Sequence, residues 1–269
     1  MRMTFTALLA PALAFALTMT IDDFNVEIGL SASYDHSPGG TWAGWDETAT
    51  SWDFGSVSGG NVVTVNVVSP SGQPGAASFP SAQYCEAVTN PTIDPVYSYF
   101  SVVDNNVVQY GFHTTVSGYV VDAVYAPPRN VFVFPMGVGD SWSSSYTYTY
   151  FLMGLPVNCQ ESHNVSVVGE GGVRTPASAP GWWACLVFMD YSTYSDNWGN
   201  NEARYTYTWA VPNGFAGCNE AVAIQSNPGA APTFTAYDNR FVVTSTTATP
   251  DPWTELGRTT WGDIKATAW

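Results

Sequence analysis

Hydrophobic and polar residues alternate along much of the chain with the two-residue period of a β-strand. Trp142-Ser-Ser-Ser-Tyr-Thr-Tyr-Thr-Tyr150 alternates aromatic and hydroxyl side chains, and Val62-Val-Thr-Val-Asn-Val-Val68 is rich in β-branched residues. A strand with one packed face and one wet face has this pattern. Similar segments cover residues 116–124, 164–168, 183–191, 204–211, 221–225 and 241–245.

Clusters of glycine, asparagine and aspartate separate these segments, as turns between antiparallel strands do. They lie at residues 58–61, 104–106, 169–172, 196–201 and 227–229. No segment of useful length shows the 3.6-residue period of an amphipathic helix. The sequence therefore predicts an all-β fold, either an antiparallel sandwich or a partly open barrel.

The N-terminus has the layout of a secretory signal peptide. Arg2 precedes an apolar run over residues 4–18, and Ala12 and Ala14 are small enough for a signal peptidase. Residues 1–20 are therefore expected to direct export to the cell surface or medium and to be removed. The alternative is an apolar start that is retained and buried. The run is shorter than the ~20 residues of a membrane span, so none is expected after processing.

Residues 21–243 are expected to form the β-rich domain. The paired prolines in residues 126–129 predict a break, because proline cannot donate to a central ladder. This break either separates two subdomains or crosses between two sheets. Residues 244–252 are rich in threonine and proline and predict an extended linker.

The C-terminal tail, residues 253–269, is aromatic. Its apolar side chains are Trp253, Leu256, Trp261, Ile264 and Trp269. Exposure of each to water forgoes ~1.5–3 kcal/mol of burial, so the tail is expected to be covered. It either folds onto its own domain or docks onto a partner subunit or export receptor, with Trp261 as the main anchor.

Charge narrows the choice of partners. Only 11% of residues are charged, and the net charge is −15. Nucleic acid is excluded as a partner, because phosphate binding requires a basic surface. Anionic membrane surfaces are disfavoured for the same reason. The chain has a single lysine, and lysine is a residue that commonly prevents an exposed sheet edge from pairing with another chain. Contacts between copies or with another cell-surface protein are therefore expected.

Four cysteines predict disulfides in an exported chain. If residues 183–191 and 204–211 form a hairpin, Cys185 and Cys218 come within disulfide reach. The remaining pair is then Cys85 and Cys159, which would tie the two halves of the chain together.

Catalytic patterns are weak. Gly139-Asp-Ser141 is similar to an esterase nucleophile block, but it lies among strands and no G-x-S-x-G elbow is present. Three histidines, His36, His113 and His163, lack metal-ligand spacing. Candidate carboxylates for a glycosidase are Asp122, Glu161, Glu170 and Asp190, which the sequence alone cannot pair. No catalytic residue is predicted.

Two binding features remain. Asp190, Asp196 and Glu202 lie in an oxygen-rich stretch that is a weak candidate for calcium, though the same residue types make ordinary turns. No other cofactor is expected. Trp42, Trp45, Trp182 and Trp183 are candidates for glycan or protein contact. The adjacent Trp182 and Trp183 would point to opposite faces of a strand, although aromatic residues also fill ordinary β cores.

Short phrases carry a resemblance to a known group. They are Thr50-Ser-Trp-Asp-Phe54, Phe79-Pro-Ser81, the segment from Phe134-Pro135 to Gly139-Asp-Ser-Trp142, and Thr260-Trp-Gly-Asp-Ile-Lys265. The chain resembles, over about residues 45–265, a group of exported β-rich proteins of Bacteroidetes and related bacteria. The resemblance implies an exported β protein and transfers no site or activity.

Three function classes follow, and the sequence favours the first. The first is an extracellular, non-catalytic structural or assembly protein that self-associates at the cell surface or into a polymer, in line with the β content, the low charge and the aromatic tail. The second is a module that binds a glycan or another surface polymer, in line with the tryptophans. The third is a secreted hydrolase.

Overall fold

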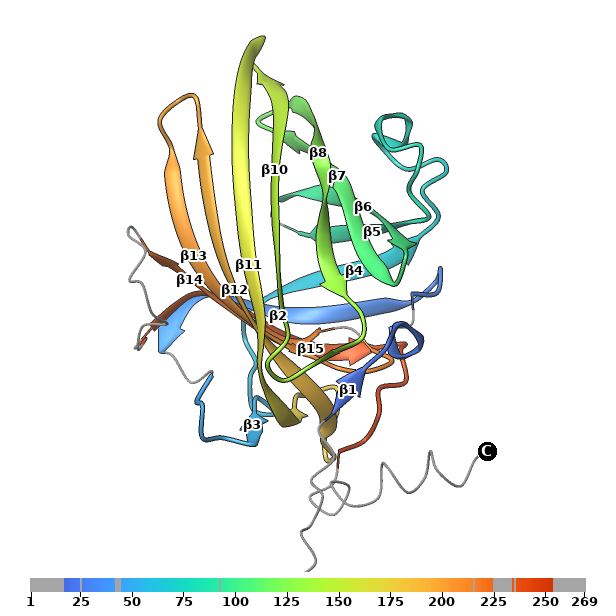
Figure 1. Ribbon diagram of the computed structural model, residues 1–269, viewed down its shortest axis with the longest axis vertical. Helices are drawn as coiled ribbons and strands as arrows, with labels where there is room; N and C mark the ends of the chain where they lie inside the picture. Colours follow the sequence, from blue (N-terminus) through green and yellow to red (C-terminus); the bar gives the residue numbers. More distant parts are fainter. Residues whose placement is uncertain are drawn as a thin grey trace, which may run out of the picture.

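The structure is a computed structural model that describes residues 17–24, 26–41, 45–91, 93–214, 216–224, 234 and 236–253, without the side chains of residues 93 and 216–224. Antiparallel strands dominate it (Figure 1). The strands are β1 (Thr18–Met19), β2 (Ser31–Thr41), β3 (Ser51–Asp53), β4 (Asn61–Val68), β5 (Tyr84–Asn90), β6 (Ile93–Val103), β7 (Asn106–Val116), β8 (Tyr119–Val133), β9 (Met136–Gly137), β10 (Ser141–Leu152), β11 (Leu155–Arg174), β12 (Trp183–Asp196), β13 (Asn201–Ala210), β14 (Ala216–Ile224) and β15 (Ala236–Thr246). Two short 3-10 turns lie at Ile21–Asp23 and Ala76–Ser78. None of the helical segments in the described ranges is long and apolar enough to cross a bilayer.

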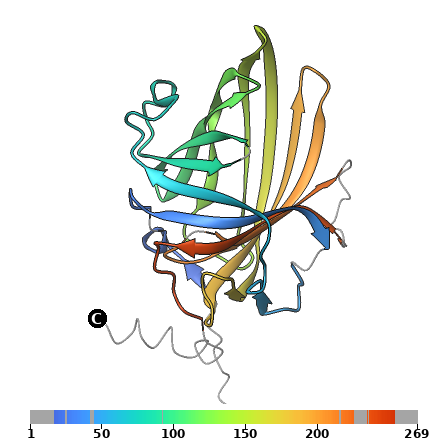
Figure 2. The same ribbon diagram turned by 180° about the vertical axis from the view of Figure 1, so that it is seen from behind.

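One large sheet contains thirteen of these strands, in the order β10-β8-β7-β6-β5-β4-β2-β15-β14-β13-β12-β11-β3. The sheet curls until β10 also pairs with β11, from Ser141↔Ser166 to Leu152↔Leu155. On its other side β10 meets β8 through the single pair Thr147↔Ala126. The all-β prediction is confirmed, and the curl is only partly closed. Seen from behind in Figure 2, β2, β4 and β15 cross in front of the long hairpins.

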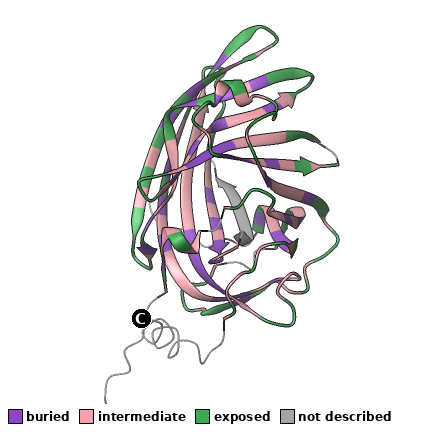
Figure 3. Ribbon diagram, turned by 90° about the vertical axis from the view of Figure 1, so that its right-hand side faces the viewer, coloured by how far each residue is buried: buried purple, intermediate pink, exposed green. Residues whose placement is uncertain are grey.

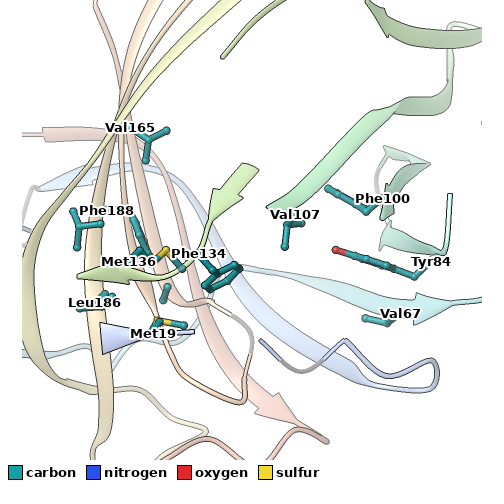
Figure 4. Packing of buried hydrophobic residues seen from close by; sticks show 12 residues of the cluster. Met19, Val67, Tyr84, Phe100, Val107, Phe134, Met136, Val165, Leu186 and Phe188 are labelled. Carbon is teal, nitrogen blue, oxygen red and sulfur yellow. The ribbon is translucent and has the colours of Figure 1, made fainter. Parts of the chain in front are cut away.

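The inside of the curl is filled at one end by an apolar cluster (Figure 4). Leu186 and Phe188 of β12 meet Val107 and Phe134 from the opposite wall. Met19 of β1 belongs to the same cluster and is 2% exposed. Because β1 pairs with β9, residues that were expected to end the signal peptide form part of the fold.

A second apolar cluster lies on the other face of β12 and β13. Trp52 and Phe54 pack edge-on against Trp209, and Trp45 stacks on Trp52 with ring centroids 5.8 Å apart. The segment around β3 therefore covers the outside of the sheet. This segment includes the tryptophan-aspartate-phenylalanine block.

The glycine-rich run at residues 169–172 is strand rather than the predicted turn, since it lies within β11. A Cβ at Gly171 would lie 2.1 Å from the carbonyl oxygen of Thr50, and one at Gly172 would lie 2.4 Å from the Trp253 ring. Glycine is needed there because other segments pack directly on the backbone. The prediction of a turn at residues 169–172 was therefore wrong, and close packing is the reason for the glycines.

The paired prolines interrupt a ladder without ending a strand. β8 runs through residues 126–129, and its pairing with β7 is irregular there, between Gln109↔Arg129 and Gly111↔Val124. One sheet contains the residues on both sides of the prolines. Proline is tolerated because it falls at an irregularity.

The expected linker is only partly extended chain. Thr244, Ser245 and Thr246 end β15, which lies between β14 and β2, so the prediction that this stretch avoids a central strand was wrong at its start. Further on, the Ala184 amide donates to the Asp251 carbonyl at 3.0 Å, and Pro252 forms a bridge with Trp183. The chain thus returns to β12 and packs on it.

Candidate functional site

A cleft of about 690 Å³ lies along the concave face of β11, β12 and β13, with β8 opposite. Alternating positions on neighbouring strands share this face, because the registers are His163↔Ser192↔Arg204 and Glu161↔Tyr194↔Glu202. Charged and hydroxyl side chains dominate its walls, and an apolar floor continues into the interior core. The lining residues used below are Arg129, Val131, Phe132, Glu161, His163, Val165, Phe188, Asp190, Ser192, Glu202, Arg204, Thr206 and Thr208.

His163 is the centre of a hydrogen-bonded network in this cleft. Its Nδ1 lies 2.8 Å from Asp190 Oδ2, and its Nε2 lies 3.6 Å from Glu161 Oε2. Arg129 Nη2 donates to the same Asp190 oxygen at 3.2 Å. Two carboxylates therefore flank one imidazole, and an arginine from the opposite wall completes the group.

Two tyrosines from β10 fix the position of Glu161. The Tyr148 hydroxyl donates to Glu161 Oε1 at 2.7 Å, and the Tyr146 hydroxyl donates to Oε2. The Tyr146 hydroxyl also lies 3.1 Å from His163 Nε2. Tyr125 of β8 stacks on Tyr146 with ring centroids 4.1 Å apart. Since these rings are almost fully buried, they hold the acid in place and leave no ring face open to a ligand.

The network favours its charged form. Burial alone would raise the pKa of Glu161, but hydrogen bonds from His163, Tyr146 and Tyr148 outweigh burial and lower it. Burial alone would lower the pKa of His163, but its hydrogen bonds to Asp190 and Glu161 outweigh burial and raise it. A carboxylate and an imidazolium are thus stabilised together.

The part of the cleft wall that β13 forms carries a second ion pair. Arg204 Nη2 lies 2.6 Å from Glu202 Oε1, and both side chains are partly exposed. Ser192, Thr206 and Thr208 add hydroxyl groups on the same face. Three polar atoms, Arg129 Nε, Asp190 Oδ1 and Arg204 Nε, are buried without a hydrogen-bond partner among the residues that the structure describes. Buried polar atoms are normally satisfied, so the two walls of the cleft have unused hydrogen-bonding capacity.

The floor of the cleft is apolar. Val131 and Phe132 of β8 face Val165 and Phe188 across it. Hydrogen-bond donors and acceptors therefore stand above a hydrophobic surface. A molecule that carries both hydroxyl groups and apolar faces matches this combination, and the volume falls within the ~300–1,000 Å³ of small-molecule sites.

The structure brings together four residues that the sequence singled out separately, namely Glu161, His163, Asp190 and Glu202. Arg129 and Arg204 were missed as functional residues. The spacing Glu202-x-Arg204 could have indicated Arg204, since residues two apart share one face of a strand, whereas no local pattern indicates Arg129.

Other polar candidates lie outside the cleft. Asp122 pairs with His113, whose Nδ1 is 2.6 Å from Asp122 Oδ1. Glu170 accepts a hydrogen bond from the Leu17 amide. His36 bonds to Asn239 and stacks on Phe241. Gly139-Asp-Ser141 forms the turn before β10, with Asp140 Oδ2 accepting from the Gly137 amide.

The three calcium candidates do not converge. Asp190 binds His163 and Arg129, and Glu202 binds Arg204. Asp196 caps its own turn, where the Asn200 side chain, Tyr194 and backbone amides donate to it and lower its pKa. The described part of the chain contains no group of three or more His, Cys, Asp or Glu residues placed to hold a metal.

The predicted disulfide between Cys85 and Cys159 is wrong. Cys85, Cys159 and Cys185 are buried free thiols in three different apolar clusters. The predicted hairpin of β12 and β13 does form, but Cys218 lies on β14, with β13 in between. Two strand spacings, about 10 Å, exceed disulfide reach, so the Cys185–Cys218 pairing is also wrong.

The tryptophan candidates lie on the outside of the sheet. Trp45, Trp182 and Trp183 are partly buried in packing contacts, and Trp253 joins them with its ring 6.1 Å from that of Trp182. The Trp253 amide donates to the Trp182 carbonyl at 2.9 Å, so this first residue of the tail folds onto its own domain. Trp42, Leu256, Trp261, Ile264 and Trp269 lie outside the described residues.

Comparison with known proteins adds little. No family model matches the chain, and no curated protein matches it. One solved structure, from a Bacteroides fragilis protein described as exported and YmcC-like in fold, aligns with 82% of this chain and 96% of its own. The identity is 13% and the TM-score is 0.32. Similarity at this level establishes neither a shared fold nor a shared function.

Proposed function

We propose that the protein is an extracellular, non-catalytic binding module that takes a short saccharide in the cleft between β8 and the β11–β13 wall. The observation that carries the proposal is the pairing of a donor-and-acceptor wall with an apolar floor. Saccharides present hydroxyl groups at their edges and C–H groups on their faces. Arg204 and Thr206 would meet the hydroxyl groups, and Phe132, which is only partly buried, would meet a face.

The state of the carboxylates supports binding over hydrolysis. A glycosidase needs one carboxylic acid that keeps its proton, with a raised pKa, across from a second carboxylate. Glu161 instead has a lowered pKa, and both Glu161 and Asp190 bond to the same imidazole. Three of their four carboxylate oxygens, all but Asp190 Oδ1, are engaged in holding the wall together.

The test compares two matched arginines by calorimetry with a panel of neutral and acidic oligosaccharides. Arg204 in the cleft and Arg174 outside it each have side chains 36% exposed, and each pairs with one carboxylate. Arg204→Gln should weaken saccharide binding by about ten-fold or more, since a hydrogen bond to a charged group contributes ~1.5–3 kcal/mol. Arg174→Gln should bind as the wild type does.

Two results would count against the proposal. One is that no saccharide of the panel binds to the wild-type protein. The other is that the two variants weaken binding equally while their thermal unfolding matches the wild type. Turnover of a bound saccharide would instead favour the hydrolase.

A further inference from the structure

Exposed apolar side chains gather on three hairpins. Of the twelve large hydrophobic residues that are strongly exposed in the described ranges, eight lie on the β7–β8, β10–β11 and β12–β13 hairpins. We name this set the apolar rim. It consists of Val116, Tyr119, Val120, Val124, Phe151, Met153, Leu155 and Trp198.

The three turns lie at one end of the molecule. β11 and β12 pair up to Cys159↔Asp196, which sets the β10–β11 turn and the β12–β13 turn at the same end. The pair Thr147↔Ala126 sets the β7–β8 turn at that end as well, because β8 runs antiparallel to β10. Figure 3 shows exposed residues at the ends of these long hairpins. The cleft extends towards them, since the Tyr194↔Glu202 pair in its lining is next to the last pair before the turn.

The rim is uncharged over two of its hairpins. No Asp, Glu, Lys, Arg or His occurs in residues 141–160, which cover β10, its turn and the start of β11. None occurs in residues 114–121 of the β7–β8 hairpin either. Phe151, Met153 and Leu155 are 60%, 67% and 59% exposed. A soluble protein seldom exposes a cluster of this kind unless something covers it.

We infer that the apolar rim docks on the surface of a lipid bilayer with zwitterionic headgroups. Separate hairpin ends can each enter the boundary between headgroups and acyl chains, where apolar side chains and the ring of Trp198 are favourable. A second copy of the chain would need a continuous patch, with ~1,000 Å² buried in total, whereas these side chains stand on separate hairpins around the mouth of the cleft. The net charge of −15 disfavours binding to an anionic membrane, so we expect a membrane with zwitterionic headgroups.

Vesicle co-sedimentation tests this inference. The full chain should sediment with phosphatidylcholine vesicles and less with vesicles that contain phosphatidylglycerol at low salt. The combined variant Phe151→Ser, Met153→Ser, Leu155→Ser should lower partitioning by about ten-fold or more, because three apolar side chains leave the interface. The matched control is Ile28→Ser with Val62→Ser, two residues 59% and 56% exposed outside the rim, which should sediment as the wild type does.

Three results would overturn it. The first is a wild-type protein that stays in solution with phosphatidylcholine vesicles. The second is a rim variant that sediments as fully as the control variant. The third is a protein that does not bind vesicles and that forms a dimer in sedimentation velocity, which the rim substitutions dissociate. A second copy of the chain, and not a membrane, would then cover the apolar rim. Arg204→Gln should leave vesicle binding unchanged, so a failure of the saccharide site and a failure of membrane docking remain distinguishable.

Discussion

At the residue scale, the side chains of the cleft acquire their roles from their neighbours. Glu161, His163 and Asp190 were visible in the sequence as acids and a histidine, and alternation along the strand predicted that Glu161 and His163 face one way. The register that sets His163 beside Asp190 was not predictable, because no local pattern states which residues of two strands pair. Arg129 comes from a strand far away in the sequence and shows no pattern at all.

The buried thiols give the first residue-scale prediction. Burial raises the pKa of Cys85 to about 12 and also raises the pKa values of Cys159 and Cys185, so all three are inert thiols. Iodoacetamide should leave them unmodified in the native protein and alkylate all three in guanidinium chloride without a reductant. Peptide mapping by mass spectrometry reads the result. A peptide that joins Cys85 to Cys159 would contradict the structure.

The second residue-scale prediction concerns Glu86 and the dependence of stability on pH. Burial raises its pKa from 4.5 to about 7, so the folded state holds a proton that the unfolded state releases. The free energy of unfolding should therefore fall as pH rises through this interval, by about 3 kcal/mol, and should level off above it. Glu86→Gln should remove this fall in urea unfolding curves measured on both sides of the interval.

Glu47→Gln is the control, because Glu47 is exposed. Its unfolding curves should keep the pH dependence of the wild type. If Glu86→Gln keeps that dependence too, Glu86 does not titrate as its burial requires.

At the element scale, strands were predictable and their boundaries were less so. Alternation located β10, β12 and β13, because a half-buried strand imposes a two-residue period. The glycines at residues 169–172 were read as a turn, since nothing local shows that Thr50 and Trp253 pack on that backbone. The prolines at residues 127 and 128 were read as a boundary because proline cannot donate to a strand ladder. Nothing local shows that β8 continues through them.

The first strand gives a prediction at this scale. Thr18–Met19 forms β1 with Met19 buried, so a cut at residue 20 would remove a strand and a core side chain. If the N-terminus is processed as a signal peptide, cleavage should follow Ala16, the end of an Ala-x-Ala sequence. The new ammonium group of Leu17 would then face Glu170. Mass spectrometry of the secreted protein should find Leu17 first, and a terminus at or beyond Thr20 would contradict this.

At the scale of the whole molecule, the curl of the sheet creates the cleft. An all-β class followed from the strand pattern, which left a sandwich and a partly open barrel as alternatives. The single-pair contact between β8 and β10 was not predictable from that pattern. The cleft lies between β8 and the β11–β13 wall. Self-association, expected from the unguarded strands, stays a prediction. The long pairing of β10 with β11 leaves β10 little free edge for it.

On the proposal above, a saccharide binds in the cleft and not on the outer tryptophans. The most direct measurement is a backbone NMR titration of the isotope-labelled protein with an oligosaccharide that binds in calorimetry. Shifts are expected in the amides of residues 161–165, 188–194 and 202–208, which line or flank the cleft. Shifts confined to Trp45, Trp182 and Trp183, with the cleft amides unmoved, would contradict it.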